Sequence, residues 1–118
     1  MYANTTLSKC TKQPVVYLKP ISSGNIIISY MQRQVFIDGI EIALTKIDFD
    51  ILYFLMNHQG WVLSFEQIYS HVWGDKESVS IKNSVGCAIK RLRKKIAGQS
   101  NNDSVIKSVW SVGYKFIG

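Results

Sequence analysis

Residues 85–96 read VGCAIKRLRKKI, a run in which apolar and basic side chains alternate with helical spacing. The apolar side chains recur every three or four residues, which places them on one face of an α-helix. They are Val85, Ile89, Leu92 and Ile96. The opposite face is basic, so the pattern predicts a helix over about residues 81–97, closed by Gly98, with one packed side and one positive side.

Basic residues are concentrated in the last third of the chain. The 118 residues carry a formal net charge of +6 and a pI near 9.4. Residues 81–118 hold eight of the 14 Lys and Arg residues and a single acidic residue, Asp103. This asymmetry favours a polyanionic partner such as a nucleic acid.

The basic face has two interpretations, a solvated helix surface and a binding surface. Lys90 and Lys94 repel each other at the i,i+4 spacing, as do Arg91 and Lys95, whereas ordinary surface helices mix charges. We therefore expect an external anion to neutralise them. The helix also follows another helical segment and precedes a hairpin pattern, which is the order of a helix-turn-helix with a wing.

The segments before this helix change from a strand pattern to a helical pattern. Residues 1–14 are polar and predict a flexible arm ahead of one domain over residues 15–118. Four β-rich segments follow, at residues 15–19, 25–30, 33–38 and 40–44, with an Asp38-Gly39 hairpin signal between the last two. They predict a four-stranded antiparallel sheet.

Two shorter helices are expected between the sheet and the basic helix. Each begins at a capping-box pattern and stops at a glycine. The boxes are Thr45 with Asp48 and Ser64 with Gln67, and the stops are Gly60 and Gly74. The apolar positions are Ile47, Ile51, Phe54 and Leu55 in the first helix and Phe65, Ile68, Tyr69, Val72 and Trp73 in the second. Residues 105–118 return to strand composition, with a turn at Ser111, Val112 and Gly113.

Three stretches, in this order, resemble the OmpR/PhoB-type winged-helix DNA-binding domain of bacterial response regulators. They are LTKIDFDILYFLMNHQGWVLSFEQIYSHVWG (residues 44–74), VGCAIKRLRKKI (residues 85–96) and IKSVWSVGYKF (residues 106–116). The resemblance covers the chain from about residue 25 to its end. It implies an α+β fold: an N-terminal four-stranded antiparallel sheet, three helices and a C-terminal β-hairpin wing.

The resemblance also implies a function, sequence-specific binding of double-stranded DNA by a bacterial transcription regulator. The third helix would enter the major groove and the wing would approach the minor groove. The matching positions are Asn83, Cys87, Lys90, Arg91 and Arg93 on the helix and Ser108, Trp110 and Lys115 on the wing. By chemistry, Arg91 suits guanine or phosphates, Cys87 suits a thymine methyl group, and Lys90, Arg93 and Lys94 suit phosphates.

The family further implies partners and a cellular setting. Asp75, Lys76, Glu77 and Ser78 match the loop that can contact RNA polymerase in activators. A homodimer on direct-repeat sites and a bacterial cytoplasmic location at the nucleoid are expected, without a cofactor or a small-molecule substrate. Tethering of a longer parent chain to a membrane, or loss of a receiver domain, stays open.

A competing interpretation is a winged-helix protein-interaction module that binds an acidic partner or RNA polymerase without specific DNA binding. It rests on departures from the family pattern: Gly86 in place of Asp, Ala88 in place of a polar residue, and Trp110-Ser111 in place of Arg-Gly.

The remaining polar and aromatic candidates have structural interpretations. His58 and His71 lack ligand partners at metal-binding spacing, and no nucleophile or paired-carboxylate motif suggests an enzyme. Four aromatic residues are expected to be core and staple residues: Trp61, Trp73, Tyr69 and Phe65. Cys10 and Cys87 form no CxxC motif, so a reducing compartment is expected, and Cys87 is interpreted as a small contact residue rather than a redox sensor.

Overall fold

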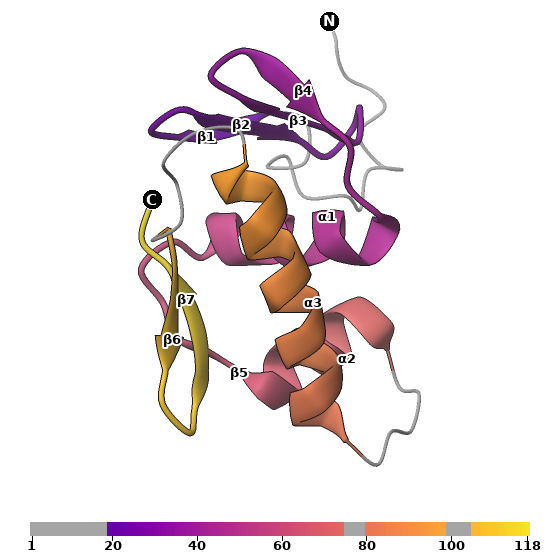
Figure 1. The fold of residues 1–118 in the computed structure, drawn as a ribbon, viewed down its shortest axis with the longest axis vertical. Coiled ribbons are helices and arrows are strands. Elements are labelled where there is room, and N and C mark those ends of the chain that lie inside the picture. Colours follow the sequence, from indigo (N-terminus) through magenta and orange to yellow (C-terminus); the bar gives the residue numbers. More distant parts are fainter. Residues whose placement is uncertain (1–18, 75–79, 99–104) are drawn as a thin grey trace, which may run out of the picture.

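The computed structural model describes residues 19–74, 80–98 and 105–118, which form a sheet, three helices and a C-terminal hairpin (Figure 1). This architecture confirms the predicted α+β winged helix-turn-helix. The strands of the first sheet are β1 (Ile21–Ser23), β2 (Ile26–Ser29), β3 (Gln34–Ile37) and β4 (Ile40–Ile42). The helices are α1 (Lys46–Asn57), α2 (Phe65–Trp73) and α3 (Ile81–Ala97). The remaining strands are β5 (Leu63–Ser64), β6 (Ile106–Val109) and β7 (Gly113–Phe116).

The first sheet is an antiparallel meander held by tight turns. Asp38 and Gly39 both have positive φ, 54° and 80°, and join the paired residues Ile37 and Ile40, which confirms the predicted hairpin. Residues 15–18 of the strand predicted at residues 15–19 lie outside the described residues, and Lys19 does not belong to a strand. Because Gly24 (φ 60°) turns the chain back at once towards β2, the first strand lies at Ile21–Ser23.

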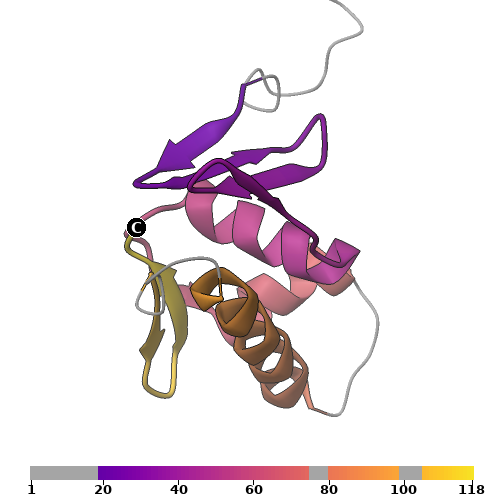
Figure 2. The same cartoon turned by 45° about the horizontal axis from the view of Figure 1, so that its top comes forward.

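The sheet covers one side of α1, and the other helices lie beneath (Figure 2). Alternate side chains of β2 and β3 are buried, as the period-two pattern requires. They pack in one core with the apolar side of α1. The members with at most 1% exposure are Ile26, Ile28, Val35 and Ile37 in the sheet and Ile51, Leu52 and Leu55 in the helix. No helix in the described part of the chain is long and apolar enough to cross a bilayer.

The helix α1 begins at the predicted cap, Thr45, but its capping box is incomplete and it ends earlier than predicted. Thr45 caps the helix through Oγ1, which accepts a hydrogen bond from the Asp48 backbone N–H at 3.1 Å. The Asp48 carboxylate does not return to Thr45 to complete a capping box, because it pairs with cations of α3. The helix ends at Asn57 instead of continuing to Gly60, whose N–H donates to the Phe116 carbonyl at 2.8 Å.

The capping box predicted for α2 is confirmed. Ser64 N–H donates to Gln67 Oε1 at 2.8 Å, and Gln67 N–H donates to Ser64 Oγ at 3.0 Å. The helix ends at Gly74, as expected.

The short strand β5 before α2 is not in the sequence prediction. It pairs with β7 and gives the second sheet the order β5-β7-β6. Gly113 belongs to β7, where it pairs with Val109, and not to the turn. A glycine is required there because a Cβ would overlap the Leu63 carbonyl oxygen. The turn is instead formed by residues 110–112, with Ser111 at φ 67°.

Trp61 does not lie in the predicted core. Its side chain is 66% exposed in the segment between α1 and β5, with its ring 5.5 Å from that of His58. Tyr69 is buried, and Phe65 and Trp73 are partly buried against the core. Trp61 lies in the segment that joins α1 to β5, outside both elements, so no helix or strand face turns its ring towards the core.

The α2 capping box yields a stability prediction. Replacing Ser64→Ala leaves the Gln67 N–H without its acceptor, so the free energy of unfolding should fall by about 1 kcal/mol. Urea denaturation of the chain measures this change. The exposed residue Ser70, within the same helix, supplies the control: Ser70→Ala should change stability by no more than about 0.5 kcal/mol, and an equal loss in both variants would contradict the capping role.

Candidate nucleic-acid interface

The packed side of α3 lies where the periodicity placed it. Val85, Ile89, Leu92 and Ile96 are all at most 1% exposed, which confirms the predicted stripe. Ala88 is buried with them, so it is a packing residue and not a surface position that has lost a polar contact. The exposed positions of the helix include Lys82, Asn83, Cys87, Lys90 and Lys94.

A buried carboxylate on α1 binds two cations of α3. Asp48 has no exposed surface. Arg91 donates to it from Nε at 3.1 and 3.2 Å and from Nη2 at 2.8 Å, and Lys95 Nζ lies 3.4 Å from its Oδ2. These hydrogen bonds raise the pKa of Arg91 above its ordinary value, so the guanidinium stays charged. The Arg91 guanidinium, which was predicted to contact guanine or phosphates, instead donates to Asp48.

Asp48 supplies an internal counter-charge for two of the cations of α3. Arg91 and Lys95 were expected to need an external anion, but Asp48 lies within salt-bridge distance of both. The counter-charge was missed because it lies 43 residues before Arg91 in the chain. The Arg91 side chain remains 46% exposed, so the cluster holds α3 on α1 at the border of the exposed face.

Arg93 contacts the wing, which consists of β6, β7 and the turn between them. Its Nη2 donates to the Ile106 carbonyl oxygen at 2.8 Å and to Ser108 Oγ at 2.9 Å, and its Nε donates to the same carbonyl at 3.2 Å. Its Cζ lies 5.5 Å from the centre of the Tyr114 ring. The predicted site residues Arg93 and Ser108 therefore meet each other.

The two faces of the wing have different neighbours. Ser108 pairs with Tyr114 on the face that contacts Arg93, whereas Lys107 pairs with Lys115 on the opposite face. Like charges directly opposite on neighbouring strands repel. Lys115 therefore lies on the face of the wing that points away from Arg93. Lys107, which was not among the predicted site residues, lies beside it and adds a second positive charge to that face. The cross-strand register would have revealed the pair.

Trp110 lies at the tip of the wing and is 90% exposed. The wing turn is tight: Val112 N–H donates to the Val109 carbonyl at 2.9 Å, and Ser111 adopts positive φ. An indole at such a turn offers a large apolar surface to a partner at little entropic cost.

Cys87 and Asn83 lie one helical turn apart on the exposed side of α3. The Cys87 thiol is free and lies 4.0 Å from Asn83 Oδ1, and Lys90 and Lys94 are exposed on the following turns of the helix. These four side chains form the exposed stripe of α3. The predicted loop residues Asp75, Lys76, Glu77 and Ser78 lie outside the described residues.

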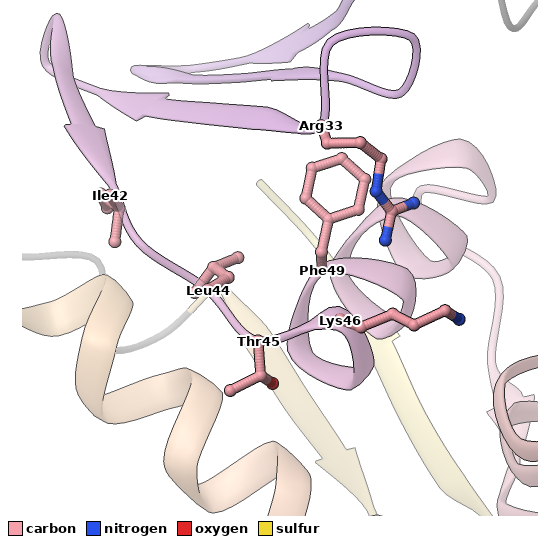
Figure 3. A pocket seen from close by; sticks show the side chains of 6 residues that line it. All are labelled: Arg33, Ile42, Leu44, Thr45, Lys46 and Phe49. Carbon is pink, nitrogen blue, oxygen red and sulfur yellow. The ribbon is translucent and has the colours of Figure 1, made fainter.

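A surface hollow of about 410 Å³ lies where the first sheet meets the start of α1. Figure 3 shows the Arg33 side chain reaching past the ring of Phe49, with Lys46 beside it. Arg33 and Lys46 both pair with Asp50, at 2.9 and 2.8 Å, and the Arg33 guanidinium lies 4.1 Å from the Phe49 ring centre. Because both cations have an internal counter-charge, the basic face of α3 is the stronger candidate for an anionic ligand.

The two histidines pack against Phe54. The His71 ring stacks on it at 4.0 Å, and the His58 ring meets it edge-on at 5.0 Å. His58 Nδ1 also lies 2.9 Å from the Phe54 carbonyl oxygen, and burial lowers the pKa of His71. Both residues therefore have aromatic packing roles at the ends of α1 and α2.

The Asp48 cluster yields a second prediction. Asp48→Asn removes the counter-charge of Arg91 and Lys95 and leaves one amide oxygen in place of two carboxylate acceptors, so the free energy of unfolding should fall by about 2 kcal/mol. Thermal and urea denaturation measure the loss. Glu66→Gln removes the same charge from an exposed position in the first turn of α2 and should cost less than about 1 kcal/mol. Similar losses in both variants would show that the buried position of the Asp48 carboxylate is not the cause.

Comparison with known proteins places this arrangement in a family. Residues 39–116 match the family model for the C-terminal domain of transcriptional regulatory proteins. The regulatory protein VanRc of Enterococcus gallinarum is 38% identical over 104 residues, which are 88% of this chain and 44% of that protein. The response regulator ArlR of Staphylococcus aureus is 37% identical over 80% of this chain and 42% of its own length. The chain thus spans less than half the length of these relatives.

Solved structures show the same architecture. The Klebsiella pneumoniae RstA DNA-binding domain, solved in complex with the RstA box, superimposes with a TM-score of 0.74 at 34% identity, over 84% of this chain and 97% of that one. The response regulator DrrB of Thermotoga maritima, an OmpR/PhoB homologue, superimposes with a TM-score of 0.72 at 35% identity, over 84% of this chain and 44% of that one. The chain therefore belongs to the OmpR/PhoB-type family of C-terminal domains of transcriptional regulatory proteins.

Proposed function

We propose that this domain binds double-stranded DNA sequence-specifically, with α3 in the major groove and the wing at the adjoining minor groove. The observation that carries the proposal is the exposed stripe of α3, where Asn83, Cys87, Lys90 and Lys94 face outward on a helix without any acidic residue. A helix of this width fits the major groove, and its lysines can neutralise phosphates. The similar RstA DNA-binding domain, solved in complex with the RstA box, supports DNA binding by a domain of this fold.

The contacts divide between positioning and reading. Lys90 and Lys94 carry point charges suited to phosphates, whereas Asn83 can pair with an adenine edge and Cys87 is small enough to meet a thymine methyl group. Arg91 and Arg93 are bonded within the chain, so direct Arg–guanine pairing contributes less than the sequence suggested. We expect two copies to bind neighbouring direct repeats and the parent protein to regulate transcription. Selection from a random duplex pool tests this, with a directly repeated motif as the expected result.

Salt dependence tests the phosphate contacts. If four or five phosphates are neutralised, log K for a random 30-base-pair duplex should fall with log salt at a slope of roughly −4. Lys90→Gln and Lys94→Gln should each reduce that slope by about 0.9. Lys46→Gln removes the same charge from α1, where it pairs with Asp50, and should leave the slope unchanged.

Two outcomes would count against the proposal. Unchanged slopes in the Lys90 and Lys94 variants would place the DNA elsewhere on the molecule. No binding to any duplex at low salt would favour the alternative, a protein-interaction module that uses the basic face on an acidic partner.

The exposed indole at the wing tip provides a separate test. Trp110→Ala should lower the affinity for the selected duplex about tenfold and leave stability unchanged, because the ring touches little of its own chain. Fluorescence anisotropy with labelled duplex measures the affinity. Trp61→Ala removes another exposed tryptophan outside the wing and should bind as the unmodified chain does. Equal affinity of the Trp110 variant would exclude the wing tip from the DNA contact.

A further inference from the structure

The contact between Arg93 and the wing joins the two parts of the proposed DNA surface. The guanidinium bonds to two positions on one strand, the Ile106 carbonyl and the Ser108 hydroxyl, and lies over Tyr114 on the other strand. Because Ser108 and Tyr114 are paired directly across the hairpin, one side chain of α3 holds both strands of the wing.

A second contact lies two helical turns earlier on α3. Gly86 and Arg93 are seven residues apart and therefore share a helix face. The Tyr114 hydroxyl lies 3.7 Å from the position that a Cβ of Gly86 would take, and its ring meets Phe65 of α2 edge-on at 5.6 Å. Tyr114 thus lies beside both α3 and α2, and the Arg93 guanidinium lies over its ring.

The hydrogen bonds of Arg93 within the chain limit the N–H donors that it has available for DNA. Nε and Nη2 donate to wing oxygens, so a phosphate would have to compete with the Ile106 carbonyl and the Ser108 hydroxyl for these donors. Lysine could not replace it here, since a single ammonium lacks the planar fork that spans two acceptors.

We propose that Arg93 is a positioning residue that clamps the wing to α3 and so sets the spacing between the exposed stripe of α3 and the wing tip. The consequence for DNA rests on the proposed function, but the clamp itself is a property of the free protein. It assigns Arg93 a role other than the phosphate contact expected from the sequence.

Amide hydrogen exchange of the free chain tests the clamp without DNA. In Arg93→Lys, amides of the wing that are protected in the unmodified chain should exchange about tenfold faster, because charge-assisted bonds to Ile106 and Ser108 are lost. Amides of Ile89 and Leu92 should keep their protection. Ser108→Ala removes one of these bonds and should give a smaller increase at the same amides, so it tests the clamp even if the Arg93 variant folds poorly. Lys90→Gln is the control and should change none of them.

DNA binding separates the clamp from a phosphate contact. With the random 30-base-pair duplex, Arg93→Gln and Arg93→Lys should weaken binding to a similar degree, and Arg93→Gln should keep the salt slope of the unmodified chain. A phosphate contact predicts instead that Arg93→Gln loses about 0.9 of the slope and that Arg93→Lys binds nearly normally. That result, or unchanged wing exchange in Arg93→Lys, would overturn the proposal. Failure of the unmodified chain to bind DNA would refute the proposed function and leave the exchange result as the test of the clamp.

Discussion

The buried carboxylate of Asp48 is the constraint on which the orientation of the basic helix depends. The Asp48 side chain has no exposed surface, and its oxygens accept hydrogen bonds from Arg91 and Lys95 of α3. A carboxylate without exposed surface is stable there only with its cations in place. The apolar stripe from Val85 to Ile96 packs α3 on the core. The ion pairs also fix the orientation of the helix, because an arginine guanidinium bonds a carboxylate in one plane.

This arrangement divides the basic residues of α3 into two groups. Arg91 and Lys95 pair with Asp48 of α1 and Arg93 bonds to the wing, so these three residues lie at contacts that hold the domain together. Lys82, Lys90 and Lys94 remain exposed. Lysines attract phosphates as point charges and discriminate poorly between bases. We therefore expect the DNA bases to be recognised by smaller groups such as Asn83 and Cys87 and by the wing tip.

Local signals in the chain predicted most of the fold. The Ser64–Gln67 capping box, the Asp38-Gly39 turn and the period of α3 all involve residues a few positions apart, and all three are confirmed. The misplaced elements depend on distant partners. Strand β5 has two residues and exists because β7 pairs with it, and Gly113 is required by the approach of Leu63. Trp61 was expected to be buried because it is a large aromatic residue, but residue type alone does not show that the segment between α1 and β5 leaves its ring exposed.

The sequence by itself determined the order of sheet, three helices and hairpin, the buried stripe of α3 and the concentration of positive charge in the last third of the chain. These properties follow from spacing and composition. The tertiary structure decided which of those charges face outward. Asp48 lies 43 residues from Arg91, and Ile106 lies 13 residues from Arg93, so only the folded chain brings each donor to its acceptor. The helical period shows on which face of α3 a side chain lies. Its hydrogen-bond partners depend on the elements that pack beside that face, which are α1 for Arg91 and the wing for Arg93.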